Sequence, residues 1–210
     1  MIRTVLSVAI VAAAVSLLPA CSSTQKTASS GTANSMSATI SMLEKAQTTI
    51  NDTVASMQSL ASAGAAEIAP AYRAFSNQLD ELQKVARQTG DRARSMNSRA
   101  DSFFKNWSEE LAEISDPEIR ARGEQRQQLT REAYERINTS MQEAKAAFDP
   151  LMEKLRDVEN VLRNDLNPAG IASVQDIIRG ASSDAAKLNK EVGDVISEMT
   201  RVREAFAPAG

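Results

Sequence analysis

Apolar residues recur at alternating steps of three and four along almost the whole chain, and this spacing limits the fold more than any other feature. The last stretch keeps the alternation without a break: Val174, Ile178, Ala181, Ala185, Leu188, Val192, Val195, Met199 and Val202. Such spacing places one apolar stripe along an α-helix, and its persistence over many turns is typical of helices that pack as coiled coils. Strands would alternate every second residue, which no segment does. The sequence therefore predicts an all-α protein.

Three short segments interrupt the apolar stripe and divide it into four helices. The first spans residues 62–70 and contains both glycine and proline. The other two contain Asp116-Pro117 and Asn167-Pro168, in which an N-capping side chain precedes a proline suited to the first helical turn. These segments are short, so we expect each helix to fold back directly on the one before it.

The positions of the apolar residues on either side of each turn indicate how the helices pair. If two helices fold back on each other, the numbers of facing residues must add up to nearly the same value at every layer. This holds across the second turn for Leu82–Leu151, Leu79–Leu155 and Phe75–Val158, and for equivalent pairs across the other two turns. We therefore expect residues 36–207 to form an antiparallel up-down-up-down four-helix bundle or coiled coil, with a helix 2–helix 3 hairpin tip that extends beyond the rest.

The N-terminus has the pattern of an export signal. A basic start at Arg3 precedes an apolar stretch that is too short to cross a bilayer, and Leu18-Pro19-Ala20-Cys21 follows it. These four residues resemble the lipobox of bacterial lipoproteins, which implies a signal peptide at residues 1–20 and acyl chains such as palmitate on Cys21. The alternative is an ordinary secretory signal with an incidental cysteine.

The residues after Cys21 bear on where an anchored protein would lie. Ser22 follows the cysteine, and by resemblance to other bacterial lipoproteins the absence of aspartate there favours the outer membrane. Residues 22–35 are rich in Ser, Thr, Ala and Gly and lack large apolar groups, so we expect residues 21–35 to be a flexible tether. We expect the periplasmic face of the outer membrane as the location.

Composition excludes several classes of function. The chain has 27 acidic and 24 basic side chains, which is unfavourable for binding nucleic acid. It has no histidine and one cysteine, so the usual catalytic bases, nucleophiles and ligands of transition metals are missing. We therefore expect no catalytic residues, no metal and no cofactor, and a protein that is not an enzyme.

Charges at the hairpin tip occupy the unfavourable ends of their helices. Acidic residues end the second helix and arginines begin the third, although the helix dipole favours the opposite arrangement. The residues are Glu109, Glu110, Glu113, Arg120, Arg122 and Arg126. We expect Glu113 to face Arg120 and Glu110 to lie near Arg122. Such pairs can simply fix the register of the hairpin, or the tip can be a docking surface, and the sequence leaves both interpretations open.

Aromatic residues gather just below these charges. The group comprises Phe103, Phe104, Trp107 and Phe206. In the expected bundle helix one ends near Met96, which leaves the fourth helix position vacant at this level. The aromatics can fill a three-helix core with Arg126 stacked on Trp107, or they can line an apolar groove for a partner helix, a second copy of the chain or lipid.

The segment AFDPLMEKLRDVENVLRNDLNPAGIASVQ, residues 147–175, resembles the family of bacterial lipoproteins called Domain of Unknown Function 2959. Members of that family have a lipobox, long charged helices, a DP pair inside the third helix and an LN…IASL turn into the last. Here Leu166-Asn167 precedes Ile171-Ala172-Ser173-Val174, with valine in place of leucine. The resemblance covers roughly residues 40–206, and it implies no activity and no functional residues.

Together these features predict a non-enzymatic, membrane-anchored periplasmic lipoprotein that acts as a helical scaffold or adaptor. Its expected partners are the membrane, through acyl chains on Cys21, and an envelope protein that contacts the tip. The alternative is a lipid-engaging or membrane-remodelling protein that uses the aromatic end of the bundle. Association with a second copy of the chain stays open as well.

Overall fold

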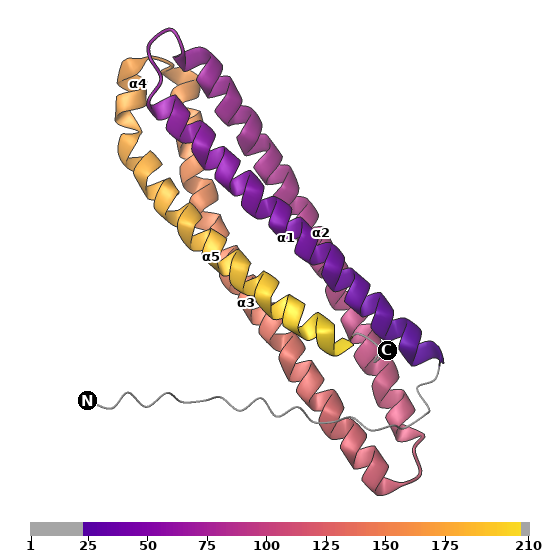
Figure 1. Cartoon of the computed structure of the whole chain (residues 1–210). Helices are drawn as coiled ribbons and strands as arrows, with labels where there is room; N and C mark the ends of the chain where they lie inside the picture. Colours follow the sequence, from indigo (N-terminus) through magenta and orange to yellow (C-terminus); the bar gives the residue numbers. More distant parts are fainter. Residues whose placement is uncertain (1–22, 207–210) are drawn as a thin grey trace, which may run out of the picture.

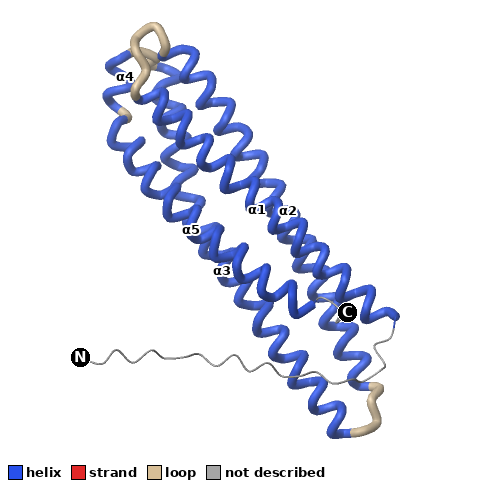
Figure 2. The backbone as a smooth tube through the Cα atoms, viewed as in Figure 1, coloured by secondary structure: helices blue, strands red, loops and turns tan. Residues whose placement is uncertain are grey.

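A computed structural model describes residues 23–206 of the 210-residue chain, and within this range every regular element is a helix (Figure 2). The elements are α1 (Ser23–Ala61), α2 (Ile68–Ala112), α3 (Pro117–Asn164), α4 (Pro168–Ser173) and α5 (Gln175–Phe206). The expected all-α class is therefore confirmed. The predicted signal peptide and Cys21 lie outside the described residues.

The four long helices form a bundle in which each runs antiparallel to its neighbours (Figure 1). Hydrogen bonds and ion pairs join α2 to α3 through Ser76–Glu159 and α3 to α5 through Arg136–Glu198. Others join α1 to α2 through Thr53 and the carbonyl of Gln78, and α1 to α5 through Gln47 and the carbonyl of Asn189. In chain order the helices thus surround one core, and α1 and α3 are both neighbours of α5.

Capping side chains begin helices where the sequence predicts them. The Asp116 carboxylate accepts hydrogen bonds from the backbone N–H groups of Glu118 and Ile119, at 2.9 and 3.0 Å. The Asn167 side-chain oxygen accepts from Ala169 and Gly170, at 2.8 and 3.0 Å. These bonds satisfy backbone donors that have no partner within the helix.

The expected fourth helix is divided into two. α4 has six residues and ends at Ser173, and the N–H of the following residue, Val174, bonds to the carbonyl of Ile171 three residues earlier. The α-helical pattern resumes when Ile178 bonds to Val174. The apolar spacing continues through this break, because Ile171, Val174 and Ile178 are all buried, and this is why the sequence pattern alone did not reveal the division.

A continuous core runs along the bundle. Its largest fully buried side chains include Phe75, Phe104, Met36, Ile50, Met57, Leu79, Leu82, Leu151 and Leu155. The buried polar residues of the described chain are four threonines of α1, at positions 32, 39, 49 and 53. The hydroxyls of Thr39, Thr49 and Thr53 donate to backbone carbonyls four residues earlier, so these side chains are buried without an unpaired donor.

The expected tether at residues 21–35 is wrong over the part that the structure describes, because α1 begins at Ser23. Thr32 and Met36 are buried, and Gly31 lies close to the Arg99 side chain of α2. Tertiary packing against α2 therefore outweighs the weak helix propensity of a Ser-, Thr- and Gly-rich segment. As a result α1 has 39 residues, and α5, with 32, is the shortest of the four long helices.

Candidate functional site

The candidate site is the end of the bundle where α2 and α3 continue as a hairpin after α5 has ended (Figure 1). α5 ends at Phe206, whereas α2 runs to Ala112 and α3 begins at Pro117. The sequence predicts that one of the four helix positions is vacant at this level because helix one has ended. One position is vacant, but the end of helix one is not the cause. Helix one continues to Ser23, and the position left empty is that of α5.

The aromatic residues at this end are buried rather than exposed along a groove. Phe103 packs edge-to-face on Phe104 and on Trp107, with ring centroids 5.3 and 5.4 Å apart. All three side chains are at most 7% exposed. Of the two interpretations of this cluster, the structure therefore favours a filled core. A groove lined by these three rings is ruled out. The side chain of Phe206 lies outside what the structure describes.

Two arginines of α3 lie over these rings from the outside. The Arg126 guanidinium is 5.5 Å from the centroid of Trp107, which confirms the predicted cation–π contact. Arg131 is closer to Phe104, at 4.4 Å, and the sequence analysis missed it. The apolar spacing could not identify Arg131, because a charged residue that covers a ring from its exposed edge leaves no periodic signal.

A polar pair also missed from the sequence links the two helices of the hairpin. Tyr134 is buried against Phe104, with ring centroids 6.1 Å apart, and its hydroxyl donates to the Asn97 side-chain oxygen at 2.7 Å. Burial raises the pKa of Tyr134, and the nearby Asp101 and Glu135 carboxylates raise it further. The hydroxyl therefore stays protonated and serves as a hydrogen-bond donor between α2 and α3.

Arg120 does not form the expected ion pair with Glu113. Arg120 donates from Nε and Nη2 to the carbonyl of Ile114, at 3.0 and 2.5 Å, and so caps the end of α2 rather than facing Glu113. Arg122 forms an ion pair within its own helix, at 3.8 Å from Glu118. The pairing of Glu110 with Arg122 therefore stays a prediction. Glu109 pairs with Lys105 along α2, at 3.9 Å.

Two large apolar residues of α3 at this end are exposed. Ile119 is 44% exposed and Leu129 is 60% exposed. Gln127 of the same helix faces α2 instead, where its amide donates to the Phe104 carbonyl at 3.0 Å. Without α5 to cover its core side, α3 turns a different set of residues toward α2, because a two-helix pair buries only the side of each helix that faces the other.

The exposed side of α3 at this end forms one surface, which we call the open α3 face. It consists of Ile119, Arg122, Arg126 and Leu129, spaced by three, four and three residues. At 3.6 residues per turn these four residues fall within an arc of about 80°. The Arg122 side chain is 82% exposed, and Arg126 is exposed as well. The open α3 face therefore combines two apolar and two cationic side chains.

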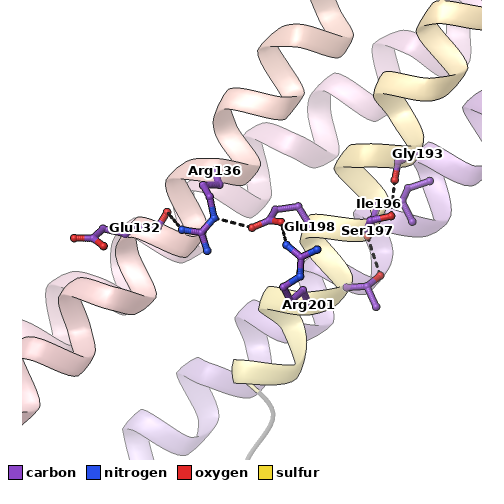
Figure 3. Close-up of polar contacts among 8 residues, drawn as sticks. Glu132, Arg136, Gly193, Ile196, Ser197, Glu198 and Arg201 are labelled. Atoms are coloured by element: carbon purple, nitrogen blue, oxygen red, sulfur yellow. Dashed lines mark hydrogen bonds and ion pairs between the residues drawn. The ribbon is translucent and has the colours of Figure 1, made fainter. Parts of the chain in front are cut away.

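Glu198 secures α5 to α3 shortly before α5 ends (Figure 3). Its carboxylate accepts from Arg136 Nε at 2.9 Å and also pairs with Arg201 of its own helix. The Glu198 side chain is only 12% exposed, so this pair is better shielded than the other ion pairs of this end. The four-helix part of the molecule thus ends at an ordered junction.

The described part of the chain shows no group of three or more His, Cys, Asp or Glu side chains that could hold a metal ion. Within residues 23–206, no helix combines the length and the apolar character needed to cross a membrane. The exposed side chains of the hairpin end include apolar and cationic groups on α3 and acidic groups on α2.

One family model, described as "Protein of unknown function (DUF2959)", matches residues 33–205. The match covers the bundle and both helices of the hairpin. No curated protein and no solved structure matches the chain at a significant level.

Proposed function

The chain belongs to the family of proteins of unknown function DUF2959, and from this premise we propose that it is a lipid-anchored, non-enzymatic scaffold or adaptor of the bacterial cell envelope. The observation that carries the proposal is the position of Leu18-Pro19-Ala20-Cys21 directly before α1, which begins at Ser23. A rigid bundle that starts two residues after an acylated cysteine is suited to holding a surface at a fixed place beside a membrane.

The anchor consists of acyl chains on Cys21. Each buried CH₂ contributes about 0.8 kcal/mol, and one acyl chain alone binds only reversibly, so the two or three chains of a bacterial lipoprotein give a durable attachment. Serine at position 22 favours sorting to the periplasmic face of the outer membrane.

The hairpin end contacts a protein of the envelope. It projects beyond the end of α5, and its α2 side presents Glu109 and Glu113, which are both exposed. The helix dipole disfavours exposed carboxylates at the C-terminal end of a helix. A basic surface on the partner would pair with these carboxylates and offset that cost. The action on the partner is binding and positioning, without a cofactor.

Photo-crosslinking in cells tests this function. A photoreactive residue is placed at Glu109, at Glu113 or, as the control, at Asn164, which is exposed at the opposite end of the bundle. We expect a discrete protein adduct from the first two positions and none from the control. If Glu109 and Glu113 give no adduct under any growth condition, the docking function is wrong.

The anchor is tested separately by fractionation. The unchanged chain should float with membranes in a sucrose gradient and should carry labelled palmitate. The Cys21→Ser variant should lose the label and leave the membrane fraction. A palmitate-free chain that is released as a soluble protein would contradict the lipid anchor.

A further inference from the structure

We infer that the open α3 face rests on the phospholipid surface of the membrane that holds the anchor. This inference deepens the proposed function and depends on acylation of Cys21. It concerns a different side of the hairpin from the acidic α2 side assigned to a protein partner.

The chemistry of the open α3 face suits the interfacial layer of a bilayer. Ile119 and Leu129 lie ten residues apart, about 15 Å along the helix, and both are exposed. Arg122 and Arg126 lie between them. In the interfacial layer apolar side chains enter the acyl boundary while arginines reach lipid phosphates, and the long arginine stem can lie along the apolar region.

The length of chain before α1 places this end of the bundle at the membrane. Only Ser22 separates Cys21 from Ser23, so an extended link spans at most about 7 Å between their Cα atoms. The first turn of α1 therefore stays close to the lipid surface. An anchor on a long flexible tether would leave the distance between the start of α1 and the membrane free, whereas this one does not.

The anchor and the open α3 face border the same side of the molecule. α1 and α3 are the two helices that flank α5 in the bundle. Where α5 ends, the start of α1 and the helix α3, which carries the open α3 face, lie on either side of the position that α5 vacates (Figure 1). A bilayer that meets this side touches both at once, and α5 stops before it would stand in the way.

Charge disfavours a second copy of the chain as the occupant. A symmetric contact between two open α3 faces would bring Arg122 and Arg126 of one copy against the same arginines of the other. Acidic groups do not dominate the face itself: Glu118 pairs with Arg122, and Glu124 lies on the opposite side of α3 by helical spacing. Lipid phosphates supply the anions that two arginines between apolar residues require.

Fluorescence quenching tests the contact in the full acylated protein. Single thiols are introduced by Ile119→Cys, Leu129→Cys or, as the matched control, Val161→Cys, since Val161 is an exposed apolar residue toward the opposite end of α3. Each variant is labelled with bimane and inserted into vesicles of phosphatidylethanolamine and phosphatidylglycerol, with or without bromine on the acyl chains. We expect bromine to reduce emission about twofold at positions 119 and 129 and not at 161.

Charge reversal then tests the role of the arginines. The paired changes Arg122→Glu and Arg126→Glu should abolish most of the quenching at position 129 while the protein still floats with the vesicles. Equal emission from all three positions, in protein that floats, would overturn the lipid contact and leave the anchor intact. Thiol–thiol crosslinking between copies at position 129 would overturn it in favour of a dimer. Protein that does not float would instead contradict the anchor and the proposed function.

Discussion

The two halves of α3 share one amphipathic pattern but have opposite surroundings. In the body of the bundle Leu151, Leu155 and Val158 are 0% exposed, because α5 covers them. Toward the hairpin, Leu129 is 60% exposed at the level of the last residues of α5, and Ile119, which lies beyond the end of α5, is 44% exposed. The comparison shows that an apolar stripe predicts a helix face that can be buried, whereas the length of the neighbouring helix decides whether it is buried.

The strongest test of this comparison uses the same substitution in both halves. Leu155→Ala should lower the free energy of unfolding by about 2–5 kcal/mol, because it leaves a cavity in a fully packed layer. Leu129→Ala should change it by less than about 0.5 kcal/mol, because the side chain is mostly exposed. Urea denaturation followed by circular dichroism measures both. A similar loss for the two variants would mean that Leu129 is covered in solution.

Glycine substitutions separate a rigid turn of the body from a more adaptable hairpin. A Cβ on Gly170 would lie 1.9 Å from the backbone oxygen of Asp165, so Gly170→Ala should cost about 1–3 kcal/mol. A Cβ on Gly123 would meet the Leu111 side chain at 2.3 Å, and that side chain can move. Because alanine also favours the helix, Gly123→Ala should stay within about 1 kcal/mol of the parent. Thermal unfolding of both variants measures these two losses of stability. A larger loss for Gly123→Ala than for Gly170→Ala would mean that the hairpin is the more rigid of the two regions.

Ion pairs of the two regions should differ in the same direction. Glu198→Ala removes the shielded contacts to Arg136 and Arg201 and should cost about 1 kcal/mol. Glu109→Ala removes an exposed pair with Lys105 in the hairpin and should cost at most about 0.5 kcal/mol. Chemical denaturation at low and at high salt measures both losses. A cost at Glu109 that matched the cost at Glu198 would argue that the hairpin depends on its charges.

The smallest expected effect is a pH dependence in the body. Hydrogen bonds from Lys84 and Lys45 lower the pKa of Glu81, which lies on α2 and contacts α1 through Lys45. A lowered pKa means that the contribution to stability is present above the ordinary carboxyl range and disappears as the pH falls through the pKa of the folded state. The difference in stability between the parent and Glu81→Gln should therefore shrink on acidification. An unchanged difference between neutral and acidic pH would show that the ion pairs add nothing.

The sequence predicts the parts of the fold that depend on local chemistry. Asp116 and Asn167 cap helices as expected, because their side chains bond to backbone donors only two or three residues away. The pairing of α2 with α3 is also predictable, since long apolar stripes on both sides of a short turn fix the register. Contacts such as Arg126 on Trp107 follow from that register.

The missed features depend on partners distant in sequence. The start of α1 at Ser23 results from packing against α2, although the local composition favours a loop. The exposure of Ile119 depends on where α5 ends, and the buried Tyr134 hydroxyl has its hydrogen-bond partner, Asn97, across the hairpin. Among the candidate residues, Phe103, Phe104 and Trp107 lie together as predicted, but their accessibility could not be read from spacing alone.

The unbroken α1 helix also sets the distance between its first turn and the opposite end of the bundle. Its 39 residues rise about 1.5 Å each, so the loops at residues 62–67 and 165–167 stand on the order of 60 Å from the first turn of α1. Attached to a membrane at that turn, the molecule cannot hold those two loops farther than this from the lipid surface, and it holds them closer where the open α3 face rests on the lipid. Removing one heptad from each long helix would shorten that maximum reach by about 10 Å without changing the core-facing pattern.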